Sequence, residues 1–256
     1  MDIVYKEKNV TLVHADAFEY LKSLKNESID IVITDPPYFL SNDGFSNSGG
    51  KFVSVNKGDW DKDNGSSEEF YSILLSEVYR VLKKDGTLWI FGTMHNIYTI
   101  GYLLKKYDFK ILNNITWQKT NPAPNLSRRM FTHSTETILW AKKNTGKQVF
   151  NYDLMREENG GKQMKDVWST STTSKGEKRF GKHPTQKPVS ILSRIIKAST
   201  TEDMTILDTF IGSGTTAVAA LLNNRKVIGV DNQLEYLNIA IKRIKNIDSE
   251  KVGKIK

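Results

Sequence analysis

The chain has 256 residues, of which 26% are charged and 38% are hydrophobic, and its formal net charge is +8. This length and balance fit one sizeable globular α/β domain with insertions, or two small domains. The absence of cysteine excludes disulfides, thiolate zinc sites and a cysteine nucleophile. The positive charge favours an anionic partner such as nucleic acid.

The sequence has no signal that points to a membrane or a metal. No run approaches the roughly 18 apolar residues of a membrane span, and the first ten residues lack the apolar core of a signal peptide. We therefore expect a cytoplasmic protein with no membrane partner. No second ligand stands at a metal-site spacing from His183, so no metal is expected. A homodimer is left open.

The first half of the chain alternates strand and helix patterns. Ile29–Thr34 is apolar without alternation, which is typical of a parallel strand covered on both faces. The segment from Ser41 to Gly65 is rich in Gly, Ser, Asn and Asp and predicts a long loop. Ser66 and Glu69 form a capping box before the next helix, and Gly86 precedes a strand. The predicted elements are strands at Val10–His14, Ile29–Thr34, Thr87–Gly92, Lys110–Trp117 and Glu136–Lys142 and helices at Asp16–Leu24, Phe70–Leu82 and Asn96–Tyr107.

The strands at Lys110–Trp117 and Glu136–Lys142 are expected to pair, with a Pro- and Asn-rich loop between them. The segment from Lys143 to Lys182 shows little periodicity. Between Gly160 and Lys187 there are seven Lys or Arg residues against two acids. Trp168 lies among them and could equally belong to the core. This segment is the best candidate for a substrate-binding insertion.

The last third is regular again. Pro188 is placed in the first turn of a helix. The predicted elements are helices at Pro188–Ser199, Thr215–Asn223 and Leu234–Ile247 and strands at Met204–Asp208 and Lys226–Val230, the second ending in Asp231. Strands that alternate with helices predict a parallel, doubly wound sheet.

The stretch "FIGSGTT" places Gly212 and Gly214 between a strand and a helix, where small residues let the backbone approach a ligand. Asp231 ends the next strand, the position of an acid that accepts hydrogen bonds from ribose hydroxyls. A tight turn without a ligand is the alternative. Ala217 replaces the third glycine of a dinucleotide fingerprint, and no P-loop lysine follows. The expected ligand is a nucleoside without a pyrophosphate, and S-adenosylmethionine fits.

The stretch "IVITDPPYFL" ends a strand at Asp35, Pro36, Pro37 and Tyr38. Adjacent prolines cannot donate backbone hydrogen bonds, so the strand must end there. One interpretation is a simple strand terminator. The other is a rigid pocket with an acid and an aromatic ring at its mouth.

"DPPY" followed by "FIGSG" resembles the β-class of amino DNA methyltransferases, whose order of motifs is circularly permuted. "SNSGG", "NNITWQKTNPAPNLS", "KQMKDVW" and "GKHPTQKP" look like the DpnA-type adenine methyltransferases of DpnII restriction systems. The resemblance implies a mostly parallel seven-stranded sheet, of which the strand at Val10–His14 is the third strand and the strand that ends at Asp231 is the second. It implies a catalytic part (1–142), a target-recognition insertion (143–182) and a cofactor-binding part (183–256).

The resemblance implies methyl transfer from S-adenosylmethionine to adenine N6, within GATC, in duplex and also single-stranded DNA. Asp35 and the Pro36 carbonyl would accept hydrogen bonds from the amino group, held by Pro37, and Tyr38 would stack on the flipped base. Without a cysteine, methylation at cytosine C5 is excluded. Methylation at cytosine N4, and a catalytically silent nucleic-acid-binding subunit, remain alternatives.

Further residues are assigned to the cofactor. Asp16 is expected near its adenine, although a helix N-cap explains Asp16 equally well. Phe210 packs beside the cofactor or belongs to the core, and Lys187 pairs with the cofactor carboxylate. The expected cofactor-binding set is Asp16, Ala17, Lys187, Asp208, Phe210, Gly212, Ser213, Gly214, Thr215, Thr216, Asp231 and Asn232.

Basic and amide side chains of the variable regions are assigned to DNA, because they bind phosphates and base edges. A solvated basic loop is the alternative. The expected DNA-binding set is Lys119, Asn121, Arg128, Arg129, Lys162, Lys165, Lys175, Lys178 and Arg179.

Overall fold

The computed structural model describes residues 1–39, 45–48, 51–54 and 67–247, except for the side chains of 45–48 and 51–54. The strands are β1 (Asp2–Glu7), β2 (Val10–His14), β3 (Ile29–Thr34), β4 (Phe45–Ser48), β5 (Lys51–Ser54), β6 (Leu82–Gly92), β7 (Phe109–Lys119), β8 (Thr135–Lys143), β9 (Val167–Thr170), β10 (Thr205–Asp208) and β11 (Lys226–Asp231). The helices are α1 (Ala17–Ser23), α2 (Ser67–Val81), α3 (Ile97–Lys106), α4 (Tyr152–Glu158), α5 (Val189–Ser199), α6 (Thr215–Leu222) and α7 (Leu234–Lys245).

One sheet organises the molecule, in the order β1-β2-β11-β10-β3-β6-β8-β7-β9. The five strands from β2 to β6 run parallel, whereas β8 is antiparallel to both of its neighbours. The mostly parallel α/β class and the pairing of β7 with β8 are confirmed, and β2 lies beside β11. The prediction of seven strands is wrong, because the edge strands β1 and β9 extend the sheet to nine.

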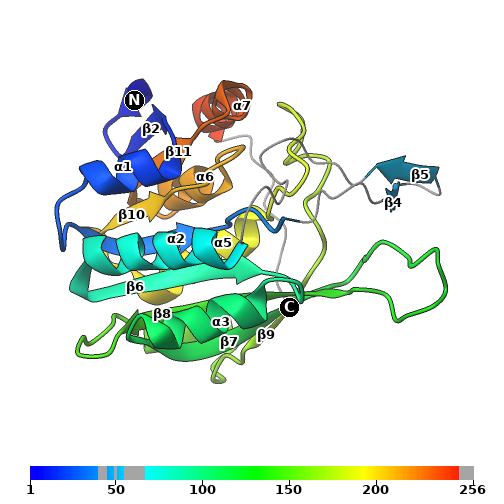
Figure 1. Ribbon diagram of the computed structural model, residues 1–256, viewed down its shortest axis with the longest axis horizontal. Helices are drawn as coiled ribbons and strands as arrows, with labels where there is room; N and C mark the ends of the chain where they lie inside the picture. Colours follow the sequence, from blue (N-terminus) through cyan, green and yellow to red (C-terminus); the bar gives the residue numbers. More distant parts are fainter. Residues whose placement is uncertain (40–44, 49–50, 55–66, 248–256) are drawn as a thin grey trace.

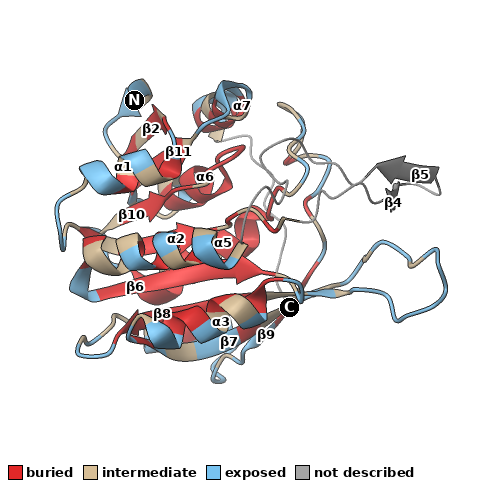
Figure 2. Ribbon diagram, viewed as in Figure 1, coloured by how far each residue is buried: buried red, intermediate tan, exposed pale blue. Residues whose placement is uncertain are grey.

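Helices cover both faces of this sheet (Figure 1). Side chains of α1, α2 and α3 share one hydrophobic cluster with the sheet, and those of α5, α6 and α7 share the other. Burial runs along the central strands and the inward faces of these helices (Figure 2). A central parallel strand covered on both faces needs apolar residues at successive positions, and β3 has them at Ile31, Val32 and Ile33.

The two motifs of the sequence meet at one edge of the sheet. β3, which leads to Asp35, pairs directly with β10, which ends at Asp208. At the ends of these strands, the hydroxyls of Thr34 and Thr209 lie 3.3 Å apart in the interior. From this pair of strands the chain continues outward in opposite directions, through β11 on one side and β6 on the other. Such a switch point is where ligands bind in open α/β sheets.

Two predictions, the long loop from Ser41 to Gly65 and the place of Gly86 before a strand, need correction. The segment from Ser41 to Gly65 contains the antiparallel pair β4–β5, and its other residues lie outside the described part of the chain. Gly86 lies inside β6, where a Cβ would come within 2.9 Å of the Asp30 carbonyl oxygen. Gly86 therefore permits close strand packing.

Helix ends differ slightly from the expected positions. Pro188 is the N-cap of α5, one residue before the helix, because its extended ψ of 137° places it outside the first turn. α2 begins at Ser67, so the Ser66 half of the predicted capping box lies outside the described residues. Such one-residue shifts are common at helix ends.

The segment from Lys143 to Lys182 is partly built into the core. It contains α4, with Met155 buried, and β9, which pairs in parallel with β7. Trp168 is also buried, and its indole N–H donates to the Lys165 carbonyl oxygen at 2.9 Å. Of the two interpretations of Trp168, the structure supports the core residue.

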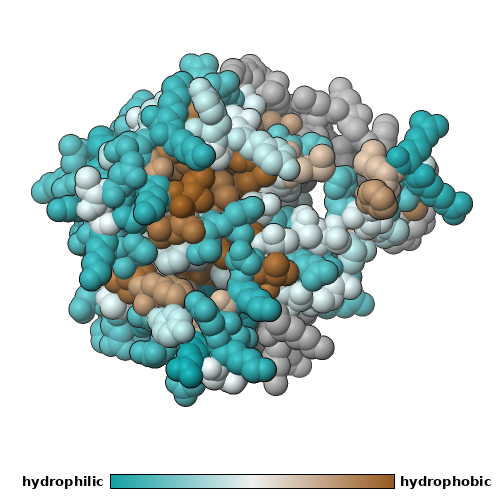
Figure 3. Space-filling view, turned by 90° about the horizontal axis from the view of Figure 1, so that it is seen from below, coloured by the Kyte–Doolittle hydropathy of each residue, from teal (hydrophilic) through white to brown (hydrophobic). Residues whose placement is uncertain are grey.

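Among the described residues, no helix combines the length and the apolar character needed to cross a membrane. Seen from below, the surface is largely hydrophilic around an apolar area near its centre (Figure 3).

Candidate active site

The DPPY segment is held by neighbours on two helices. The Tyr71 hydroxyl of α2 donates to the Pro37 carbonyl oxygen at 2.6 Å and accepts from the Asn96 side chain at 2.9 Å. Asn96 is the N-cap residue of α3, and its side-chain Oδ1 accepts from the Thr93 N–H at 2.8 Å. The residues Tyr71 and Asn96 are both buried. The segment after β3 is therefore fixed in direction by a buried polar chain as well as by its prolines.

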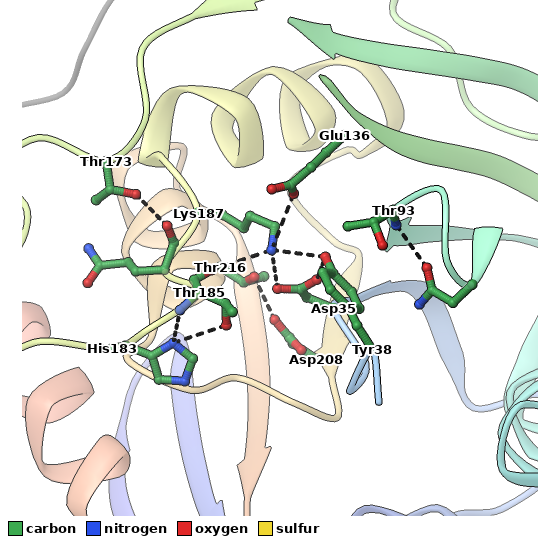
Figure 4. Close-up of polar contacts among 12 residues, drawn as sticks. Asp35, Tyr38, Thr93, Glu136, Thr173, His183, Thr185, Lys187, Asp208 and Thr216 are labelled. Atoms are coloured by element: carbon green, nitrogen blue, oxygen red, sulfur yellow. Dashed lines mark hydrogen bonds and ion pairs between the residues drawn. The ribbon is translucent and has the colours of Figure 1, made fainter. Parts of the chain in front are cut away.

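Lys187 lies at the centre of the polar contacts (Figure 4). Its ammonium group forms a short ion pair with the Asp35 carboxylate, donates to the Tyr38 hydroxyl at 3.2 Å and lies 3.6 Å from Glu136. The Tyr38 hydroxyl donates to the other oxygen of Asp35. Lys119 pairs with Glu136 at 2.6 Å. Lys119, Glu136, Lys187 and Asp35 thus form a chain of alternating charges, here called the charge chain.

The charges of this chain stabilise one another away from water. Burial opposes the charge of Lys187, but the carboxylates of Asp35 and Glu136 outweigh it and raise the pKa of Lys187. Burial also opposes the charge of Glu136, but Lys187 and Lys119 outweigh it and lower the pKa of Glu136. Burial, and then the negative charge of Asp35, raises the pKa of Tyr38 well above its ordinary value. Tyr38 is therefore a hydrogen-bond donor to Asp35.

The glycine turn is closed by two acids. Asp231 accepts from the Gly212 N–H and the Gln233 N–H, both at 2.8 Å. Asp208 accepts from the Phe210 N–H at 3.0 Å and the Thr216 hydroxyl at 2.6 Å. Burial raises the pKa of Asp208 to about 7, despite these two hydrogen bonds, which lower it. Burial likewise raises the pKa of Asp231.

The two glycines meet different neighbours. Gly212 has a φ of +49°, and a Cβ there would lie 2.9 Å from the Nε2 atom of His183. Gly214 has a φ of +81°, and its Cβ would lie 2.5 Å from that of Ala240 on α7. Gly214 is thus required by the packing of α7, whereas Gly212 lets the turn approach the imidazole that lines the pocket.

An open pocket with a volume of about 160 Å³ lies at the carboxyl ends of the strands. Phe18, Phe70 and Phe210 form an aromatic wall: the Phe18 and Phe70 rings are 5.0 Å apart, edge to face, and Phe70 and Phe210 are 6.0 Å apart. Acids and amides supply its polar groups. The lining residues are Asp16, Ala17, Phe18, Asp35, Pro37, Phe70, His183, Thr185, Thr209, Phe210, Asp231, Asn232, Gln233 and Tyr236.

A smaller cavity adjoins this pocket and shares Asp35, His183, Thr185 and Phe210 with it. It contains most of the remaining residues assigned to the cofactor, namely Lys187, Asp208, Gly212, Ser213, Thr215 and Thr216. The structure therefore brings the glycine turn, Asp231 and the DPPY segment together around connected space.

Sequence reasoning missed part of this lining. Phe70 and Tyr236 come from helices whose periodicity signals only a buried face, so no sequence pattern distinguishes them as pocket residues. Asp16 is the N-cap of α1, since its Oδ1 accepts from the N–H groups of Phe18 and Glu19. Its other oxygen makes neither capping bond, so capping and pocket lining are compatible.

The residues assigned to DNA fall into separate places. Lys119 belongs to the charge chain, and Asn121 accepts from the Thr172 N–H at 2.8 Å. The arginines at positions 128 and 129 are exposed on the β7–β8 loop. Lys162 and Lys165 precede β9, whereas three others follow its carboxyl end, namely Lys175, Lys178 and Arg179. Only Lys178 of these five is half-buried, and the others are exposed.

Across the part of the chain that the structure describes, no group of three or more His, Cys, Asp or Glu side chains could hold a metal ion.

Comparison with known families decides the identity of this arrangement. The family model for N6 and N4 DNA methylases matches residues 29–242, which include the DPPY segment, the charge chain and the glycine turn. The chain belongs to the N6/N4 DNA methylase family. The matched region contains Asp35 and most of the residues that line the pocket beside it.

Relatives of this DNA methylase are type II methyltransferases. It is 59% identical over 244 residues to M2.DpnII of Streptococcus pneumoniae, which covers 94% of this chain and 91% of that protein. The identity and coverage are the same for M2.LlaDCHI of Lactococcus lactis subsp. cremoris. It is 39% identical to M.HinfI of Haemophilus influenzae, over 93% of this chain and 68% of that one.

Solved structures support the same placement. The complex of M1.HpyAVI with SAM is similar, with a TM-score of 0.67 and 28% identity over 91% of this methylase and 99% of that chain. The cytosine-N4-specific PvuII DNA methyltransferase has a TM-score of 0.74 over 96% and 93% of the two chains. Its identity is 19%, so this likeness shows the fold alone.

Proposed function

We propose that this DNA methylase transfers a methyl group from S-adenosylmethionine to N6 of adenine in GATC, as the modification enzyme of a restriction-modification system. One observation carries the proposal: Asp35 borders the same pocket as Asp231, which accepts from the Gly212 N–H of the glycine turn. An acceptor for the target amine and a site for a nucleoside cofactor thus share one space. The 59% sequence identity to type II methyltransferases, over 94% of this chain, supports the restriction-modification role.

The residues present fit the cofactor. Asp231 and Asn232 provide polar groups at the end of β11, where ribose hydroxyls are bound in nucleotide-binding α/β folds. The aromatic wall of Phe18, Phe70 and Phe210 suits a flat adenine ring. Asp16 lies at the same wall, where it could accept from an amino group. When bound, S-adenosylmethionine supplies an electrophilic methyl group on a sulfonium.

Asp35 and the Pro36 carbonyl are assigned to the target amine. The lone pair of an exocyclic amine is conjugated with its ring, so acceptors must draw that nitrogen toward tetrahedral geometry. The Pro37 carbonyl accepts from Tyr71, and the Pro36 carbonyl is assigned as the backbone acceptor for the amine. Lys187 and the Tyr38 hydroxyl orient the Asp35 carboxylate before the base arrives. Such preorganisation lowers the reorganisation needed in the transition state.

The sequence led us to expect that Lys187 pairs with the cofactor carboxylate, but its ammonium group pairs with Asp35. It contacts Asp35, Tyr38 and Glu136, and we assign it chiefly to the catalytic acid. Tyr38 is buried in this form, so stacking on a flipped base requires its ring to become accessible when the base enters.

The DNA is assigned to the face at the carboxyl ends of the strands. We propose that the β7–β8 loop and the basic residues after β9, Lys175, Lys178 and Arg179, contact it. The recognition function is thus placed in two segments, the β7–β8 loop and residues 143–182. Exposed Lys and Arg side chains there would bind phosphates in a salt-dependent manner.

Mass spectrometry of nucleosides tests the proposal directly. The protein is incubated with S-adenosylmethionine and duplex or single-stranded oligonucleotides that contain GATC or a scrambled site. We expect N6-methyladenine only from the GATC substrates. N4-methylcytosine would replace the adenine assignment, whereas no methylated nucleoside from any substrate would favour a silent binding subunit.

A further inference from the structure

Phe131 is 97% exposed, the highest value among the large hydrophobic side chains of the described residues. It lies in the loop between β7 and β8, where Met130 is 61% and Leu126 40% exposed. An aromatic ring costs free energy in water unless a partner covers it. A single exposed apolar side chain is common on protein surfaces, but several on one loop indicate an interaction surface.

The loop tip has a defined conformation. The Asn125 side-chain amide donates to the Met130 carbonyl oxygen at 3.1 Å, and its oxygen accepts from the Ser127 N–H at 3.0 Å and the Ser127 hydroxyl at 2.7 Å. Arg128 adopts a left-handed φ of +55° within this turn. One asparagine therefore ties both sides of the tip and presents the residues beyond it.

The loop leaves the sheet at the edge that carries the active site. Thr34, the last residue of β3, pairs with Ile90 of β6, and the end of β6 at Gly92 pairs with Thr137 of β8. β7 and β8 therefore open into their loop beside the carboxyl end of β6, at the same edge of the sheet as that of β3, and the loop projects outward from the body there (Figure 1). At its base, the Lys119–Glu136 ion pair continues through Lys187 to Asp35.

The charge of the loop selects the partner. From Thr120 to Ser134 it has two arginines and no acid. Both arginines are exposed and immediately precede Met130 and Phe131. Guanidinium groups beside an apolar tip match a duplex, in which phosphates lie outside a stack of bases. A second copy of this loop would bring like charges together instead.

We propose that Phe131 enters the base stack of duplex DNA at the target pair and stabilises the duplex from which the adenine has been extruded. This inference rests on the proposed function. Removal of a base from the stack costs a few kcal/mol, less when the base is already unpaired. A ring that replaces some of the lost stacking favours the extruded state. Arg128 and Arg129 hold the flanking phosphates.

Phe131→Ala is compared with the parent on two duplexes, one with a normal target pair and one whose target adenine faces an abasic site. We expect kcat/KM to fall about 10- to 100-fold on the normal duplex, in line with base–aromatic stacking. On the abasic duplex, where no pair must be opened, the loss should be under about threefold. 2-Aminopurine at the target position reports extrusion directly, because its fluorescence rises when it leaves the base stack. The rise on protein binding should be smaller with the variant than with the parent.

Phe131→Trp keeps a stacking ring and is expected to restore most of the normal-duplex activity. Tyr102→Ala removes another exposed aromatic side chain, 62% exposed on α3, and is the matched control. Equal losses on both duplexes, with unchanged 2-aminopurine fluorescence, would overturn the inference. Sedimentation then tests whether Phe131 instead joins two copies. If the parent protein methylates neither duplex, the proposed function is refuted. The 2-aminopurine assay then still tests whether Phe131 promotes base extrusion.

Discussion

At the scale of single residues, the charge chain explains why a carboxylate and a lysine share a buried place. Asp35 is 20% and Lys187 8% exposed at the side chain, and neither charge would be stable there alone. A buried charge is retained where it holds another group in position, and here that group is the proposed acceptor for the amine. Substitution of either partner should therefore lower the rate of methyl transfer more strongly than it lowers the free energy of unfolding.

Asp35→Ala is expected to lower the single-turnover rate of methyl transfer at least about 100-fold, or roughly 3 kcal/mol, as for other preorganised contacts. Cofactor affinity should change less than tenfold, because the acid acts mainly in the transition state. Tritiated cofactor measures transfer, and calorimetry measures binding. Asp35→Asn, which keeps the shape, serves as the comparison. Transfer at the parental rate by Asp35→Ala would reduce the DPPY segment to a strand terminator.

Glu136→Gln tests whether the second acid of the chain positions Lys187. Without its negative charge the pKa of Lys187 should fall, because Glu136 helps to raise it. The alkaline limb of the kcat–pH profile should move to lower pH, and kcat should fall several-fold with little change in KM. Glu27→Gln removes an acid paired with Lys143, at 3.3 Å and outside the site, and is the control. An unmoved alkaline limb would show that Glu136 is only structural.

At the scale of elements, the sequence predicts most of the sheet because the central strands are apolar runs bounded by helices. Edge strands are harder to predict: β1 is largely exposed and β9 has four residues, so neither shows a strong pattern. The sequence also does not reveal that Lys187 pairs with Asp35. The two residues are 152 positions apart, and only the folded sheet brings their segments together. Phe131 looks in sequence like any residue of a polar loop.

The glycine turn is an element whose backbone decides the site. Gly212→Ala should weaken cofactor binding at least about tenfold, because the new Cβ meets His183, and should destabilise the fold by about 1–2 kcal/mol at a left-handed φ. Calorimetry and chemical unfolding measure the two effects. Adding His183→Ala should relieve the contact but not the backbone cost. Gly101→Ala in α3, with Leu139 at an ordinary 3.7 Å, should instead be neutral or stabilising. Unchanged affinity in Gly212→Ala would separate the turn from the cofactor.

At the scale of the whole molecule, residues distant in sequence are assembled at one edge of one sheet. Asp35 follows β3, Asp208 ends β10, and Asp231 ends β11, and these strands are consecutive neighbours. The DPPY segment precedes the glycine turn in the chain, but this permuted order does not alter the site, because the sheet places the two motifs side by side. This arrangement also concentrates acids: Asp35 and Asp231 both act to raise the pKa of Asp208. The cost of holding these charges together should be visible in the pH dependence of global stability.

Asp208 provides that test. Burial raises its pKa from 3.8 to about 7, so the folded state binds a proton more tightly than the unfolded state. The contribution of Asp208 is then most favourable below about pH 4 and is lost progressively as the pH rises to about 7. Asp208→Asn should make the unfolding free energy less dependent on pH in this window. The amide can accept from the Phe210 N–H and donate to the Thr216 hydroxyl, as a neutral carboxyl would. Urea unfolding at pH 5, 6, 7 and 8 measures the difference between variant and parent, which should shift in favour of Asn as the pH rises. A difference that is constant over this range would mean that Asp208 is ionised throughout and that its two hydrogen bonds outweigh its burial.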